Sequence, residues 1–304
     1  MKKILVTGSN GFLGQKVVDL LAKNDQYDVV AISKGPNRNP NQVNYAFFQV
    51  DLSDREKLTD FLSAQTFDAI VHTAAMTSVE ACEADQAACQ LLNVDLVAYL
   101  ASYCTAHQTQ LIHLSTDFVF DGKKNAPYDE TDLPNPQSEY GKSKYASEQV
   151  LVQSNCNYAI LRTILVYGIN ADPNRSNLVL WAKSKLSQND PIKVVNDQWR
   201  MPTFVDDLAY ACQLAIDRKA QGIFHISGAE LMSINEAVYK IADYWQLDKG
   251  LISEISAASI GQAENRPRQT GFDLTRSNAE LGYVPTSFMD SLAIIDNQFK
   301  TFGR

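Results

Sequence analysis

Short apolar runs alternate with helical patterns along the first half of the chain. The apolar runs predict strands at residues 4–7, 28–33, 46–50, 69–73, 110–114 and 158–165. Between them, apolar positions recur with the spacing of amphipathic helices at residues 12–23, 54–64, 84–107 and 138–154. This alternation predicts an α/β fold with a doubly wound, Rossmann-type parallel sheet. The nearly continuous apolar character of the strands agrees with helices on both faces of that sheet.

The second half of the chain is less regular, and the strict alternation weakens after residue 168. We expect an amphipathic helix at 203–217, a strand at 222–228 and a helix at 233–245. Ser53 and Ser233 are each followed three residues later by glutamate, the spacing of a helix capping box. The pattern predicts a dinucleotide-binding domain, residues 1–168 plus about 203–228, and a smaller mixed substrate-binding lobe, about 169–202 plus 229–304.

The composition is that of an ordinary globular protein and excludes several classes of partner. Hydrophobic residues make up 45% of the 304 residues, and the formal net charge is −8. An acidic chain without clusters of lysine and arginine is not expected to bind nucleic acid. No apolar run approaches the length of a membrane span, so no membrane partner is predicted.

The cysteines and histidines indicate the cellular compartment and whether a metal site is expected. The five cysteines include no C-x-x-C pair, and the short apolar run at the N-terminus is not expected to be a secretion signal. An odd number of cysteines in such a chain indicates reduced thiols in the cytoplasm. The four histidines are scattered without metal-ligand spacing, so no metal site is predicted.

A glycine-rich segment, TGSNGFLG, links the first predicted strand to the first predicted helix. Gly8, Gly11 and Gly14 permit a tight turn and a close approach of the backbone to a phosphate. The helix that follows offers free N–H groups and the positive end of its dipole. The spacing G-x-x-G-x-x-G at this place predicts a dinucleotide pyrophosphate site, with a plain turn as the alternative.

The end of the second strand indicates which nicotinamide dinucleotide binds. NAD sites commonly place an acidic residue there for the ribose hydroxyls, but no acid occurs between Val29 and Asp51. Ser33, Lys34 and Arg38 occupy this segment instead, and a hydroxyl with two cations suits a 2′-phosphate. We therefore predict NADPH as the cofactor. NADH is the alternative, in which the two cations are only solvated loop charges.

Tyr140 and Lys144 share one face of a predicted helix because they stand four residues apart. A lysine beside a phenol lowers the pKa of the phenol and so makes it a better proton donor near neutrality. Chance produces this spacing readily in a chain with 13 tyrosines, so the position carries the argument. The pair follows the polar break Ser115-Thr116-Asp117, at the sheet edge where ligands bind. Thr116 could then donate to a carbonyl oxygen that Tyr140 protonates, whereas Ser115 should point to the opposite face.

This constellation behind a glycine-rich turn resembles the short-chain dehydrogenase/reductase superfamily. Further segments follow in the order seen in extended members, and two of them resemble the dTDP-4-dehydrorhamnose reductase family in particular. The resemblance covers about residues 1–230 and is carried by TGSNGFLG, HTAAMTSVEACE, LNVD, LIHLSTDFVFDG, PYDETDLPNPQSEYGKSKYASEQ, LRTILVYG and DQWRMPTFVDDLA.

The resemblance implies roles for individual residues. Thr116, Tyr140 and Lys144 would form the catalytic triad, with Lys144 also holding the nicotinamide ribose. Other positions would contact the substrate, a nucleotide sugar, namely Asp117, Phe118, Arg200 and Arg266. The remaining positions would contact or support NADPH, namely Gly8, Asn10, Gly11, Phe12, Leu13, Gly14, Ser33, Lys34, Arg38, Asp51, Leu52, Ala74, Ala75 and Asn93.

Several of these residues have simpler structural explanations. Asp51 would equally cap the following helix, and Asn93 would equally bond to backbone. Arg200 is also readable as a solvated loop charge, as is Arg266. Arg162, on the sixth strand, is either a ligand or a buried ion-pair partner.

One departure affects the substrate. On the sixth strand, the motif of the dTDP-4-dehydrorhamnose reductase family resembles RTSWVYG. This chain has RTILVYG there, with Ile164-Leu165 in place of Ser-Trp. The exact sugar is therefore open, while the implied reaction is NADPH-dependent reduction of the 4-keto group of a nucleotide-linked deoxysugar. Two alternatives remain: an epimerase with retained cofactor, and a regulatory subunit like the methionine adenosyltransferase β subunit. The apolar segment FMDSLAIIDNQF covers either the core or a partner, which leaves a homodimer open.

Overall fold

A seven-stranded parallel sheet organises the larger part of the molecule. The computed structural model describes residues 1–171, 176–261 and 265–301. The strand order is β11-β6-β5-β4-β1-β2-β3, so the chain reverses its direction of growth between β1 and β4. The predicted fold class is confirmed. The strands are β1 (Lys2–Thr7), β2 (Tyr27–Ser33), β3 (Tyr45–Gln49), β4 (Ala69–His72), β5 (Gln110–Thr116), β6 (Asn157–Thr163) and β11 (Gly222–Ile226).

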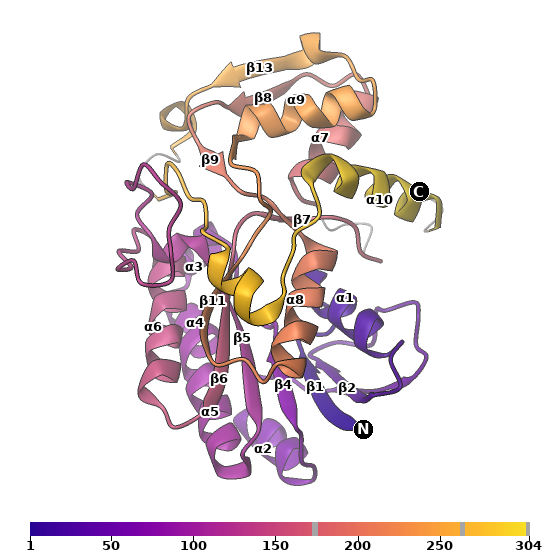
Figure 1. Cartoon of the computed structure of the whole chain (residues 1–304), viewed down its shortest axis with the longest axis vertical. Helices are drawn as coiled ribbons and strands as arrows, with labels where there is room; N and C mark the ends of the chain where they lie inside the picture. The colour runs from indigo at the N-terminus through magenta and orange to yellow at the C-terminus, as the bar shows by residue number, and fades with distance from the viewer. Residues whose placement is uncertain (172–175, 262–264, 302–304) are drawn as a thin grey trace.

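Helices cover both faces of this sheet (Figure 1). Alternation along β1 sends Ile4 and Val6 into the core under α1 (Phe12–Leu21) and α8 (Val205–Asp217). Leu5 faces the opposite core, under α2 (Arg55–Ser63), α5 (Leu96–His107) and α6 (Glu139–Gln153). Burial on both faces explains why the strands read as continuous apolar runs.

The long helix predicted over residues 84–107 is divided in the structure. It consists of α4 (Gln86–Gln90), a π-helical segment η1 (Leu91–Asp95) and α5, and a separate helix α3 (Val79–Ala84) precedes it. By length and composition, the stretch Gln86–His107 could cross a membrane, so the expectation that no run approaches a span is wrong. Half of that stretch is buried inside the protein, where α5 packs on the sheet.

The two predicted capping boxes have different outcomes. At α9 (Ile234–Tyr244), Ser233 accepts from the Glu236 N–H, and the Glu236 carboxylate accepts from the Ser233 N–H. At α2 the cap is Asp54, whose carboxylate accepts from the Lys57 N–H at 3.1 Å. The Ser53 prediction is wrong because the carboxylate of the next residue already occupies the capping position.

A smaller lobe lies beyond one end of the sheet (Figure 1). Its own apolar core joins α7 (Leu178–Ser187), β8 (Ile192–Val195), α9 and α10 (Phe288–Thr301), and β8 pairs in parallel with β13 (Ile252–Ile255). Short pairs lie between the lobe and the sheet, β7 (Val166–Tyr167) with β10 (Thr203–Phe204) and β9 (Trp199–Arg200) with β12 (Met232–Ser233). Single turns complete the fold: η2 (Asp117–Val119), η3 (Lys249–Leu251), η4 (Ala257–Ile260) and η5 (Ser277–Leu281).

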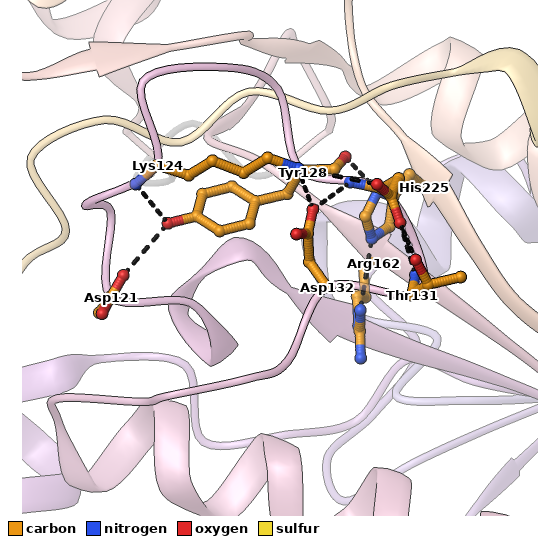
Figure 2. Close-up of polar contacts among 8 residues, drawn as sticks. Asp121, Lys124, Tyr128, Thr131, Asp132, Arg162 and His225 are labelled. Atoms are coloured by element: carbon orange, nitrogen blue, oxygen red, sulfur yellow. Dashed lines mark hydrogen bonds and ion pairs between the residues drawn. The ribbon is translucent and has the colours of Figure 1, made fainter.

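Part of the segment 229–304, which is predicted to belong to the lobe, packs against the domain that contains the sheet. Tyr128, in the loop after β5, bridges to Phe272. Its carbonyl accepts from His225 Nδ1 at 3.0 Å, and the loop residue Glu130 accepts from the His225 N–H. These contacts fasten the loop against β11, and Figure 2 shows the contact of Tyr128 with His225 together with that of His225 with Arg162. Farther along, Leu281 and Tyr283 belong to the core under α1 and α8. The chain therefore crosses between the lobe and the sheet more than once.

Candidate active site

The glycine turn at the end of β1 leaves no room for side chains. Gly8 has φ +66°, and a Cβ there would lie 2.8 Å from the Ala74 nitrogen. A Cβ on Gly14 would lie 2.3 Å from the Gly8 carbonyl oxygen. The turn opens onto the first residues of α1, Phe12 and Leu13, where backbone N–H groups lack helical partners. The site therefore fits the pyrophosphate of a dinucleotide, and the backbone of Ala74 occupies the space that a side chain at position 8 would need.

The loop after β2 is held by the same turn. Asn10 donates through Nδ2 to the Pro36 carbonyl at 2.8 Å, and its Oδ1 accepts from the Arg38 N–H at 2.8 Å. Lys34, next to Ser33 at the end of the strand, pairs with Asp51 at 3.1 Å. The Asp51 carboxylate also accepts from Ser53, which lowers its pKa, and it does not cap α2. Leu52 follows Asp51 and packs beside the core under α2.

Asn93 connects the loop after β4 to α6. Its Oδ1 accepts from the Met76 N–H at 2.8 Å, and its Nδ2 donates to the Met76 carbonyl and to Ser143 Oγ, each at 2.9 Å. The loop begins with Ala74 and Ala75, so Asn93 fixes the path of the segment predicted to lie along the cofactor. The π-helical segment that divides the long helix carries this residue.

The catalytic candidates meet where β5 ends and α6 begins. Ser138 caps α6 by accepting from the Gly141 N–H. A Cβ on Gly141 would lie 2.3 Å from the Phe118 carbonyl oxygen, so glycine permits α6 to approach the end of β5 closely. The Phe118 and Tyr140 rings meet edge to face at 5.7 Å. The Thr116 side chain acts on the pKa of Tyr140, so the structure brings these two residues together.

Burial controls the electrostatics of the triad. It raises the pKa of Tyr140 well above its usual value, while the nearby Thr116 hydroxyl acts in the opposite direction. Burial lowers the pKa of Lys144 to about 8. The expected lowering of the phenol pKa by Lys144 is therefore wrong for this structure, because burial dominates and Lys144 is not among the main groups that shift the pKa of Tyr140. At neutral pH the phenol keeps its proton and Lys144 is mostly an ammonium, which is the state required for proton donation.

Two of the predicted substrate contacts are buried at the junction with the lobe. The Asp117 carboxylate accepts from Thr116 Oγ1 at 3.1 Å and from Thr270, and it lies 3.7 Å from Arg200 Nε. Arg200 donates to the carbonyls of residues 199, 267 and 268. The solvated-charge explanation of Arg200 is wrong, since only 4% of its surface is exposed. Both groups instead fasten the returning segment to the end of β5.

Arg266 and Phe118 remain accessible to a ligand. Arg266 pairs with Glu80 of α3 at 2.7 Å, and both residues line a surface cavity of about 540 Å³. Glu83 and Ile260 line the same cavity. An anionic ligand at Arg266 would compete with the Glu80 carboxylate for the guanidinium.

Sequence reasoning missed a second polar group on the α6 side of the sheet. Ser115 lies on the same face of β5 as His113, toward α6, where it donates to Glu148. Arg162 is the buried ion-pair partner of Glu148 at 2.7 Å, which answers the question about its role. His113 lies 3.1 Å from Lys144 Nζ. The available signal was the recurrence of polar residues at alternate positions of a buried strand, 113 and 115, opposite positions 144 and 148 of the helix.

Comparison with known proteins gives relatives over the whole chain. Residues 1–300 match the family described as RmlD substrate binding domain. A probable low-salt glycan biosynthesis reductase of Haloferax volcanii is 29% identical over 98% of this chain and 98% of its own length. The methionine adenosyltransferase 2 subunit beta of Bos taurus is 32% identical over 90% of this chain and 81% of its own.

Solved structures of two reductases have the same fold. The dTDP-4-dehydrorhamnose reductase of Clostridium acetobutylicum superposes with a TM-score of 0.85 at 26% identity, covering 98% of this chain and 99% of that one. The enzyme of that name from Bacillus anthracis, solved in complex with NADP, gives 0.83 at 25% identity with the same coverage.

Proposed function

Because this chain belongs to the family described as RmlD substrate binding domain, we propose that it is an NADPH-dependent reductase of the 4-keto group of a nucleotide-linked deoxysugar. The observation that carries the proposal is that Thr116 and Tyr140 lie together, with Lys144 one turn farther along α6, at the carboxyl edge of the sheet that also bears the glycine turn. A binding module has no use for a protonated phenol one helical turn from a buried ammonium. A keto reductase needs both.

The residues of the first half would hold the cofactor. Gly8, Gly11 and Gly14 fit the pyrophosphate, and Lys34 and Arg38 would contact the 2′-phosphate. When bound there, NADPH supplies the hydride that reduces the keto carbon. The chain contributes the proton: Tyr140 donates its phenolic hydrogen to the carbonyl oxygen, and the Lys144 ammonium stabilises the phenolate that results.

Thr116 has a defined part in that step. Its hydroxyl donates to Asp117 in the structure and must turn toward the substrate oxygen to donate there. Asp117 retains the hydrogen bond from Thr270 when this happens, so its buried carboxylate is not left unpaired. Thr116 would thus add a second donor to the oxygen that gains negative charge.

The names of the relatives support a sugar substrate. One similar protein is a probable glycan biosynthesis reductase, and two similar structures are dTDP-4-dehydrorhamnose reductases, one of them with NADP. Leu165 stands at the position where the motif of the dTDP-4-dehydrorhamnose reductase family has tryptophan. We therefore propose a substrate of the nucleotide-sugar class and do not name dTDP-4-dehydrorhamnose itself as the substrate. A cytoplasmic location and a homodimer remain predictions.

A regulatory role is the second candidate, because the methionine adenosyltransferase 2 subunit beta is 32% identical to this chain. The deciding experiment is NADPH consumption against a panel of nucleotide-linked 4-keto sugars. We expect turnover with at least one of them. Absence of turnover with every sugar, together with stoichiometric recovery of an enzyme partner in a pull-down, would support the regulatory role instead.

Replacement of Tyr140 tests the mechanism. We expect Tyr140→Phe to retain NADPH binding by calorimetry and to lose about 10²- to 10⁴-fold in kcat, because only the proton donor is removed. Tyr210→Phe, at an exposed position of α8, is the matched control and should retain wild-type kcat. Unchanged turnover in Tyr140→Phe would refute the assigned role.

A further inference from the structure

Three polar side chains lie in one row across the sheet beneath α6. Thr7, His72 and His113 are register partners on β1, β4 and β5, and all three are at most 1% exposed. Thr7 Oγ1 lies 2.7 Å from His72 Nδ1. The His72 and His113 rings stack with centroids 5.8 Å apart and planes inclined by 15°. Apolar side chains would fill this space at no cost in desolvation, so the histidines require an explanation.

The row ends at the catalytic lysine. His113 Nε2 lies 3.1 Å from Lys144 Nζ and 2.9 Å from Ser147 Oγ. The Ser147 hydroxyl donates to the Lys144 carbonyl at 2.6 Å, one turn back along the helix, so its proton is already used. The lone pair of His113 Nε2 is therefore available to the lysine side chain.

The surroundings keep His113 neutral. An imidazolium would direct its Nε2–H at the Lys144 ammonium, which lies 3.1 Å away. Burial, the nearby Lys144 and His72 all lower the pKa of His113 well below its usual value. In a neutral ring that accepts from the ammonium, the proton must be on Nδ1.

No carboxylate competes for the ammonium within the described part of the chain. The nearest acid, Glu148, receives Arg162 through both oxygens at 2.9 and 2.7 Å, and it also accepts from Ser115. The other titratable groups that act on Lys144 are the thiols of Cys82 and Cys89. His113 is the one side chain hydrogen-bonded to Lys144 Nζ in those residues.

We propose that His113 is a positioning residue, which accepts a hydrogen bond from Lys144 through Nε2 and so fixes the place of the ammonium one helical turn from Tyr140. The proposal rests on the function proposed above for the triad. A neutral acceptor holds the ammonium in place without neutralising it, as a carboxylate would. The charge therefore remains available to the phenolate that forms on Tyr140 when the proton is given to substrate.

Two substitutions at this position test the role of the lone pair. His113→Leu removes the acceptor, and we expect kcat to fall about ten- to a hundredfold with KM for NADPH changed little. Loss of the acceptor also disfavours the ammonium, so the alkaline limb of the kcat–pH profile should move to lower pH. In His113→Gln the amide oxygen can accept, and both properties should return toward wild type. Equal profiles for wild type and His113→Leu, or no rescue by glutamine, would overturn the proposal.

Nitrogen-15 NMR of the histidines tests the contact without any enzyme assay. The chain has only four histidines, of which His107 is exposed and serves as the reference. We expect His113 to remain neutral with its proton on Nδ1, and we expect its Nε2 signal to move in Lys144→Met. Lys142→Met, two residues away on the same helix, should leave that signal in place.

The two arms separate the possible failures. If no sugar is reduced but the His113 signal responds to Lys144→Met, the proposed reaction is wrong and the hydrogen bond stands. A protonated His113, or an Nε2 signal that ignores Lys144→Met, overturns the positioning role even in an active enzyme. The NMR arm uses the wild-type chain as its reference, so it also decides the matter if His113→Leu fails to fold.

Discussion

Two buried cations differ in their surroundings. Lys144 belongs to α6, whereas Arg162 belongs to β6 and pairs with Glu148 of α6. Arg162 of β6 forms a two-pronged ion pair with Glu148, contacts His225 and lies 5.1 Å from the centre of the Phe120 ring. Lys144 is equally buried, at 3% exposed, but its ammonium contacts only the neutral ring of His113 among the described residues. Glu148 is four residues after Lys144 on the same helix, but its carboxylate pairs with Arg162.

The difference separates a cation with a carboxylate partner from a cation without one. A buried ion pair with every hydrogen bond satisfied has no capacity left for a ligand. A buried ammonium without a carboxylate has a lowered pKa and an unfulfilled electrostatic demand, which is typical of functional sites. The same helix thus supports both kinds of cation because Glu148 is directed at β6 and away from Lys144.

The largest expected effect concerns the ion pair. We expect Glu148→Gln to lower the free energy of unfolding by about 3–5 kcal/mol, because Arg162 would keep its charge in a buried place without a counter-ion. Lys144→Met should not reduce stability, since it removes a buried charge that lacks a carboxylate. Urea unfolding of the two variants and wild type at pH 7 would measure both effects.

A partly exposed glutamate of the same helix provides the control for this comparison. Glu139 pairs with Lys142 at the surface, and Glu139→Gln should change stability by no more than about 1 kcal/mol. A loss in Glu148→Gln no larger than that of the control would remove the distinction between the two cations. A large loss in Lys144→Met would do the same from the other side.

The second effect is a pH dependence of stability due to Lys144. Desolvation lowers its pKa in the folded protein from 10.5 to about 8. Between these two values the unfolded chain binds the proton and the folded chain does not, so stability should rise with pH in this window. Relative to Lys144→Met, we expect wild type to gain on the order of 2 kcal/mol between about pH 7 and pH 10.

Unfolding of both proteins by urea across that pH range measures the gain. Other groups titrate in the same range, but they are shared by the two proteins and cancel in the difference. A difference that stays constant with pH would mean that Lys144 is not desolvated, and the contrast with Arg162 would then rest on geometry alone.

Much of the fold could be predicted because its signals are local. The apolar runs, the glycine spacing and the Tyr140–Lys144 spacing each depend on residues close together in sequence. The partner of Ser115 is 33 residues away on another element, and nothing in the strand pattern identifies it. Arg200 reads as a loop charge until the returning segment buries it.

Local signals also fail where neighbours compete. Ser53 and Ser233 have the same capping spacing, but only Ser233 caps its helix, because Asp54 takes that place at α2. The π-helical segment within 84–107 has no signature in the apolar period. It is the place from which Asn93 bonds the loop after β4, a contact that only the folded chain creates.

The smallest expected effect concerns a third cation, Lys34, whose side chain is 80% exposed and pairs with Asp51. Solvent already weakens this pair, so Lys34 should exchange Asp51 for a 2′-phosphate at little cost. We expect Lys34→Gln to weaken NADPH binding by about three- to tenfold and to leave NADH binding nearly unchanged. Calorimetry with both cofactors measures this. Lys57→Gln removes a similarly exposed pair, with Asp54 on α2, and should affect neither. Tighter binding of NADH than of NADPH by wild type would contradict the cofactor prediction, and exposure alone would then account for Lys34.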